Sequence, residues 1–250
     1  MQNDSTPREA AALEAAQRAL DMLGFDLARY ETTSWRCRDA ARAYLAAGFS
    51  YERLGAYFER GFGRGLHDRV HSYEALPDEY VGNNMDLIAD AYLAGGDVAK
   101  RLEPLAEVLA AVVKVKGGSL AHRVQHALAL WGVGRKNDAR VRRMLAPVRT
   151  LSASERDELD LNEHRARVVL AVLDGDTAEA THWLREYDAT LPGDPNATRQ
   201  RVHLVTLALW LIARDRYGVH IAPEGIAGLP PRYAMPEAVA AGGERQAASA

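Results

Sequence analysis

The feature that most constrains the fold of this chain is a series of stretches in which apolar residues recur at helical spacing. In the stretches 98–112, 124–131 and 161–173, apolar side chains return every three or four residues, which is the spacing of one face of an α-helix. Turn signals built on glycine separate such stretches at intervals of roughly 40 residues. They are Gly96-Asp97, Gly134 to Asp138, Gly175-Asp176 and Gly218. A period of this size is typical of helical hairpins stacked side by side.

The sequence therefore predicts an all-α fold with about nine or ten helices. They are expected to form stacked hairpins, either as an α-solenoid of the TPR or HEAT kind or as an irregular helical bundle. The composition agrees, because alanine, leucine, arginine and glutamate are abundant and all favour helix. We expect a flexible N-terminal tail at residues 1–6, a single helical domain at 7–236 and a disordered C-terminal tail at 237–250.

Residues that favour helix ends set the expected boundaries. Four of them are placed to cap the first turn of the helix that follows. They are Asp97, Ser119, Asp138 and Asp176. Ser154 is expected to open one helix that continues to Gly175, and Asp194 to open the last long helix, which Gly218 ends.

Two further segments have a distinct character. A helix expected after Ser50 contains several glycines, which weaken it and allow a bend or a break. They are Gly55, Gly61, Gly63 and Gly65. After Gly218, a stretch rich in glycine and proline predicts an extended segment lying on the bundle.

Charge and cysteine content argue against a nucleic-acid-binding protein and against a disulfide-bonded fold. The net charge is −3, whereas nucleic-acid-binding proteins usually carry a strong basic excess. Cys37 is the single cysteine, so no disulfide can form within the chain. We expect Cys37 to act as a small apolar side chain on an amphipathic helix.

There is no signal-peptide pattern at the N-terminus. The longest apolar stretch, residues 202–213, is shorter than a membrane span, so a cytoplasmic location follows by elimination.

Two histidine pairs have spacing that can bind a metal. His67 and His71 are four residues apart, as are His122 and His126, so each pair would share a helix face. Neither lies in a longer metal-binding motif, and no HExxH is present. We interpret all four as histidines at helix surfaces and expect no metal, cofactor or enzymatic site.

The charged residues gather in one basic and two acidic clusters. The basic cluster comprises Arg135, Lys136, Arg140, Arg142, Arg143 and Arg149. Because no aromatic residues interleave with it, a solvated helix face or contact with an acidic partner is favoured over a nucleic-acid site. The acidic clusters are Glu74, Asp78 and Glu79, and then Glu155, Asp157, Glu158, Asp160 and Glu163. Most lie near expected helix starts, where capping is the simplest explanation, and an acidic patch that meets a basic partner is the functional alternative.

The four tryptophans lie at apolar helical positions. They are Trp35, Trp131, Trp183 and Trp210. We expect them in the core, with one or two as exposed anchors in an interface.

Several segments carry a resemblance to a known family. They are residues 80–97, 126–134, 168–176 and 207–219, followed by Leu229-Pro230-Pro231. In their order of helices, charged turns and a final Leu-Pro element, they resemble the immunity protein 49 family of bacterial polymorphic-toxin systems. Residues 44–48 and 50–58 are similar to related helical immunity proteins that neutralise nuclease toxins. The resemblance covers about residues 35–235.

The resemblance implies a non-enzymatic immunity protein that binds one cognate protein toxin, with a nuclease as a candidate, and occludes its active site. The acidic clusters would meet the toxin, at Glu74, Asp78, Glu79, Asn83, Asn84, Glu155, Asp157, Glu158 and Asp160. Neither a nucleic acid nor a membrane is an expected partner, and the chain would be a monomer or a homodimer. Two alternatives stay open: a helical-repeat scaffold or adaptor that binds peptides in a groove, and a helical metal-dependent enzyme.

Overall fold

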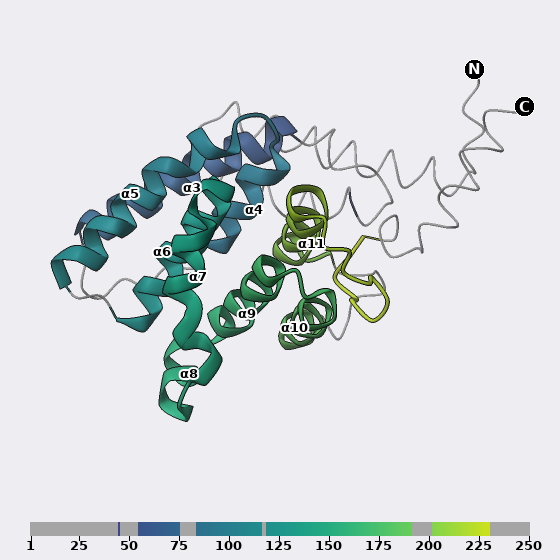
Figure 1. Ribbon diagram of the computed structural model, residues 1–250. Coiled ribbons are helices and arrows are strands. Elements are labelled where there is room, and N and C mark those ends of the chain that lie inside the picture. The colour runs from purple at the N-terminus through teal and green to yellow at the C-terminus, as the bar shows by residue number, and fades with distance from the viewer. Residues whose placement is uncertain (1–44, 46–54, 76–83, 117–118, 192–201, 231–250) are drawn as a thin grey trace, which may run out of the picture.

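Helix α6 (Leu120–Val133) lies at the centre of the fold, and every one of its residues except Arg123 is buried. The computed structural model describes residues 45, 55–75, 84–116, 119–191 and 202–230 (Figure 1). Helix α6 forms an antiparallel hairpin with α5 (Val98–Lys116). Both predicted caps are confirmed, because Asp97 accepts a bond from Lys100 N at 3.0 Å and Ser119 accepts one from His122 N at 3.3 Å.

Two helices precede this hairpin and pack against it. Helix α3 (Gly55–Ala75) contacts α5 and α4 (Met85–Leu93). Helix α3 continues through the glycines at 61, 63 and 65, so of the bend or break that they allowed, the break is absent. Gly55 has a packing reason, since a Cβ there would lie 3.1 Å from the carbonyl oxygen of Ala94, at the end of α4.

A tight turn follows α6. Gly134, at a φ of 140°, ends the helix and leads into the 3₁₀ helix η2 (Arg135–Asn137), then α7 (Asp138–Leu145) and the 3₁₀ helix η3 (Ala146–Thr150). The prediction that Asp138 caps this helix is wrong. Asp138 is its first residue, and its Oδ1 accepts a hydrogen bond from the Tyr217 hydroxyl at 2.8 Å.

The stretch expected to be one helix from Ser154 to Gly175 is two helices. Ser152, rather than Ser154, caps α8 (Ala153–Leu159) in a capping box with Glu155. Asp160, with a φ of 48° and a ψ of −132°, separates α8 from α9 (Leu161–Asp174). Among the described residues it is the only non-glycine with a positive φ. The chain changes direction there, and α8 lies at one end of the bundle (Figure 1).

Helix α9 forms the second hairpin with α10 (Thr177–Thr190). Gly175 ends α9 in the left-handed conformation, and Asp176 caps α10 by accepting from Glu179 N at 3.0 Å, both as predicted. The last helix, α11 (Leu204–Tyr217), begins after His203 instead of at Asp194. Gly218 ends it in the left-handed conformation, as expected.

The segment 218–230 crosses the bundle without helix, beside α10 and α11 (Figure 1). The predicted packing of this segment on the bundle is confirmed, because Val219, Ile221, Ile226 and Leu229 are buried. Trp210 Nε1 also donates a hydrogen bond to the Ile221 carbonyl at 2.9 Å. The segment is not fully extended, since it turns near Gly225.

The described residues contain nine α-helices and no strand, which confirms the predicted all-α class. Apolar side chains from Leu45 to Leu229 form one continuous core. None of the described helices combines the length and the apolar character that crossing a bilayer requires. The tails expected at 1–6 and 237–250, Cys37 and Trp35 lie outside the described residues.

Candidate functional site

The first predicted acidic cluster is only partly described, and one member of the expected interface is misplaced. Asp78, Glu79 and Asn83 lie outside the described residues, and α3 includes Glu74 without a described side chain. Asn84 is fully buried, so its assignment to a toxin-binding surface is wrong. It is buried because it is the N-cap residue of α4, and its backbone N–H donates to Gln125 Oε1 of α6 at 3.1 Å.

The second acidic cluster lies together on and after α8. Glu155, Asp157, Glu158 and Asp160 are all exposed. Two of them serve helix ends: Glu155 bonds Ser152, which lowers the pKa of its carboxyl, and Glu158 accepts from Ala121 N in the first turn of α6 at 3.3 Å. The side-chain carboxylates of Asp157 and Asp160 make no hydrogen bond or ion pair with the described residues and stay available to a partner.

The two histidine pairs have different environments. His67 and His71 are exposed on α3, as predicted, whereas His122 and His126 are buried in α6, so the surface interpretation is wrong for that pair. Burial, with a smaller contribution from the nearby Arg140 charge, lowers the pKa of His126 to about 4. Within the described ranges, no three His, Cys, Asp or Glu side chains are grouped so that they could hold a metal ion.

The basic cluster is largely paired with carboxylates of the same chain. Lys136 lies 3.1 Å from Glu103 of α5. Arg142 and Arg149 both bind Asp174, with 2.7 Å between Arg142 NH1 and Asp174 Oδ1. These ion pairs join α7 and η3 to the end of α9, so much of the cluster acts within the fold.

A buried aspartate paired with a half-buried histidine is a further candidate for chemistry. His203 Nδ1 lies 2.7 Å from Asp188 Oδ1, and Asp188 also accepts from Thr206 Oγ1 and from Gly228 N. Burial raises the pKa of Asp188, but these hydrogen bonds and the His203 charge outweigh it, and the pKa lies below its ordinary value. His203 N in turn donates to the Gly228 carbonyl at 2.8 Å. The pair therefore ties the segment 218–230 to α10 and α11.

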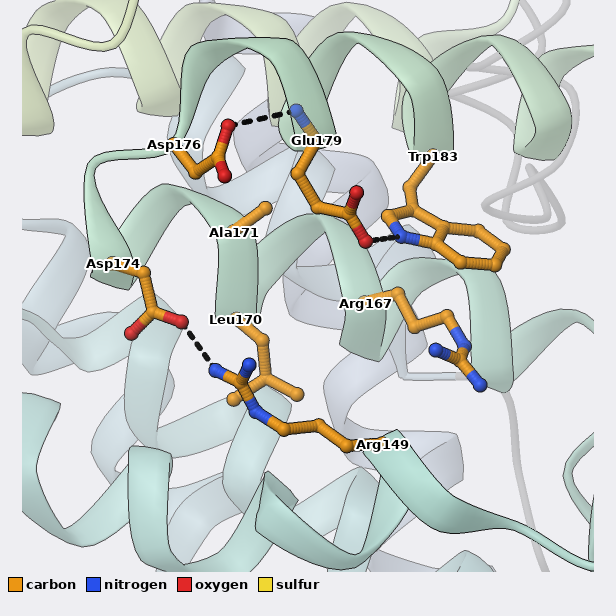
Figure 2. Close-up of a pocket in the computed structure, with 8 residues that line it drawn as sticks. All are labelled: Arg149, Arg167, Leu170, Ala171, Asp174, Asp176, Glu179 and Trp183. Carbon is orange, nitrogen blue, oxygen red and sulfur yellow. Dashed lines mark hydrogen bonds and ion pairs between the residues drawn. The ribbon is translucent and has the colours of Figure 1, made fainter.

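A surface pocket of about 160 Å³ lies between η3, α9 and α10 (Figure 2). Charged side chains, one tryptophan and two apolar side chains line it. They are Arg149, Arg167, Leu170, Ala171, Asp174, Asp176, Glu179 and Trp183. Sequence reasoning placed Arg149 in the basic cluster, Asp176 at a helix cap, and Trp183 in the core with an exposed anchor as the alternative. It did not bring any of the eight together as a binding site.

Trp183 is the only described tryptophan that is not buried. Trp131 and Trp210 lie in the core. Its indole N–H donates to Glu179 one helical turn earlier (Figure 2). The Arg167 guanidinium lies 4.5 Å from its ring centre, and the rings of His164 and His182 lie at 5.9 Å and 4.8 Å. The indole is thus held in one orientation while part of it faces solvent.

The Arg167 side chain is held in place by Glu163. Its Nε donates to Glu163 Oε1 at 2.8 Å, and the same oxygen lies 3.8 Å from Arg156 Nε of α8. A continuous chain of contacts therefore runs from α8 through α9 to Trp183 on α10. The sequence holds a signal for it, since Glu163 and Arg167, and Glu179 and Trp183, are each four residues apart on a helix.

The pocket has side chains suited to binding. Its aromatic, arginine and carboxylate side chains supply flat contact area and hydrogen bonds of fixed direction. No protein-family model, curated protein or solved structure matches this chain.

Proposed function

We propose that this chain is an immunity protein, an antitoxin that binds one cognate bacterial toxin and blocks its active site without catalysis. The observation that carries the proposal is the half-exposed Trp183, held between Arg167 and Glu179 over a preformed pocket. The resemblance of the helix order to immunity protein 49 supports the particular class of partner. A nuclease is the kind of toxin that the charge of the surface fits best.

The composition of the pocket is that of an interface anchor. Tryptophan and arginine dominate the binding energy of protein interfaces, and their replacement by alanine commonly costs about 2 kcal/mol or more. Here both lie side by side, and polar residues surround them. Such a centre with a polar rim is the usual anatomy of a specific interface.

The pocket is also preorganised. Glu163 and Glu179 fix the Arg167 and Trp183 side chains before any partner arrives, so little conformational entropy is lost on binding. The α9–α10 hairpin that presents them packs on α6 and α11, which are almost entirely buried. A rigid surface of this kind suits tight inhibition.

The charge of the surface is the third argument for the proposed function. The exposed carboxylates of Asp157 and Asp160 lie on and directly after α8, and Arg156 of the same helix contacts Glu163, which binds Arg167 of the pocket. A predominantly basic partner, such as a toxin that acts on nucleic acid, would be attracted to this side of the molecule and oriented on it.

Co-expression with the product of the gene immediately upstream tests the proposal. That product should arrest growth when expressed alone, and this chain should restore growth. Trp183→Ala should weaken the complex about 30-fold, the equivalent of about 2 kcal/mol, as measured by calorimetric titration. Leu66→Ala, which truncates another half-buried apolar residue on the distant helix α3, should bind as the wild type does.

A harmless upstream product, or a toxin that keeps its full activity in the presence of this chain, would show the proposal to be wrong. If the Trp183→Ala and wild-type proteins bind the toxin with equal affinity, the pocket is not part of the interface.

A further inference from the structure

We propose that Arg167 is the receptor for a carboxylate group of the partner, bound through the two terminal amino groups of its guanidinium. The inference rests on the proposed function for the identity of the partner as a protein, and it names the chemistry that the Trp183 pocket recognises. The occupant is an aspartate or glutamate side chain, presented by a toxin that is otherwise basic.

The first argument is the set of unused donors on Arg167. A guanidinium carries five N–H groups, and only the Nε–H is bonded, to Glu163. The two terminal amino groups have no hydrogen-bond partner among the described residues, although the side chain is only 13% exposed. A partly buried guanidinium whose remaining donors can be reached from solvent gains more from an anionic ligand than a fully solvated one does.

The second argument is orientation. The guanidinium lies 4.5 Å from the centre of the Trp183 ring, and its Nε is held by a buried carboxylate, Glu163. These two contacts restrain both the position and the plane of the group. The remaining amino groups form a planar fork, which matches the two oxygens of a carboxylate in a bidentate contact.

The third argument is the surroundings of the fork. Leu170 and Ala171 give the pocket an apolar floor, and Arg149 reaches past Leu170 from η3 to Asp174 (Figure 2). The pocket volume of about 160 Å³ is sufficient for a short side chain. The methylene groups of a glutamate or aspartate could contact the floor while the carboxylate meets Arg167.

The acidic residues of the pocket decide between a carboxylate and a phosphate. Asp174, Asp176 and Glu179 line the same pocket as Arg149 and Arg167. They repel any anion, and a doubly charged one more strongly than a singly charged one, because like charges at close range repel. A carboxylate carries one negative charge, whereas a phosphate monoester carries nearly two at neutral pH.

Acetate and inorganic phosphate are simple probes of this site. In NMR titrations of the full chain, acetate should shift the Arg167 Nε–H and Trp183 indole N–H signals along a saturating curve. Phosphate should bind more weakly. Arg167→Lys keeps the charge but loses the fork, and it should weaken acetate binding about tenfold. Arg143→Ala, which removes an exposed arginine of α7, should bind acetate as the wild type does.

A linear response to acetate, equal binding by Arg167→Lys, or tighter binding of phosphate would each overturn the assignment. Glu163→Gln provides a second variant that keeps the shape of the side chain. It should strengthen acetate binding, because it removes the carboxylate charge that offsets Arg167 while the amide oxygen can still accept from Nε.

Neutralisation of the toxin separates this inference from the proposed function. If the wild-type chain neutralises the toxin and Arg167→Lys does so equally well, the carboxylate contact is wrong and the immunity function stands. If the wild-type chain does not neutralise the toxin but binds acetate through Arg167, the immunity function is wrong and the anion-binding property of the pocket stands.

Discussion

At the scale of single residues, His126 shows how burial changes the chemistry of a side chain. Both ring nitrogens are buried without a hydrogen-bond partner in the described part of the chain, and the side chain lies in the most buried helix of the fold. A charged imidazole would be poorly solvated there. Burial and the Arg140 charge therefore lower the pKa of His126 from 6.5 to about 4.

This shift predicts a loss of stability in mild acid. Between pH 6.5 and pH 4 the unfolded chain binds a proton at this histidine and the folded chain does not, so the free energy of unfolding falls as the pH falls. In His126→Leu the free energy of unfolding should fall less with pH than in the wild type, by about 1–2 kcal/mol after allowance for solvent screening. Urea unfolding at pH 7 and pH 4.5 measures it. The exposed His67→Leu variant should keep the wild-type pH dependence, and an unchanged pH dependence in His126→Leu would contradict the pKa shift.

At the scale of elements, the break between α8 and α9 depends on one residue. Asp160 has a φ of 48° and a ψ of −132°, a conformation that glycine adopts freely and other residues adopt at a cost of about 1–3 kcal/mol. The break turns α8 so that its carboxylates are exposed and Glu158 reaches the start of α6.

Asp160→Gly should therefore stabilise the protein. Relief of the backbone strain exceeds the entropy that glycine adds to the unfolded chain, and we expect a gain of about 1 kcal/mol, measured by urea unfolding. Asp157→Gly, within the helical part of α8, should have the opposite effect, a loss of about 0.3 kcal/mol. A destabilised Asp160→Gly variant would show that the aspartate side chain, and not the backbone, determines this turn.

At the scale of the whole molecule, the segment 218–230 closes one side of the core. Asp188 of α10, His203 before α11 and Gly228 are joined by hydrogen bonds, and the aliphatic side chains of the segment are buried. A Cβ on Gly228 would overlap Asp188 Oδ1 and His203 Nδ1. Glycine at this position is therefore required by the packing.

Gly228→Ala should displace the segment and lower the free energy of unfolding by about 1–3 kcal/mol, the usual range for overpacking. Urea unfolding checks the magnitude, and Ala227→Ser, at the exposed neighbouring position, should change stability by less than about 0.5 kcal/mol. A Gly228→Ala variant as stable as the wild type would mean that the segment contributes little to the fold.

The sequence by itself determined the features that depend on neighbours a few residues away. The all-α class, the caps at Asp97, Ser119 and Asp176, and the helix end at Gly175 all arise from contacts within one turn of a helix. Such contacts are encoded by spacing alone.

Only the tertiary structure decided which side chains are buried and which meet. Asp138 bonds Tyr217 across 79 residues of sequence instead of capping its helix, Asn84 is buried against α6, and Trp183 lies at the surface while the other described tryptophans lie in the core. The spacing of residues within a helix defines its faces but does not say which helix will cover each face. Burial, and with it the binding pocket, is set by contacts between elements far apart in the chain.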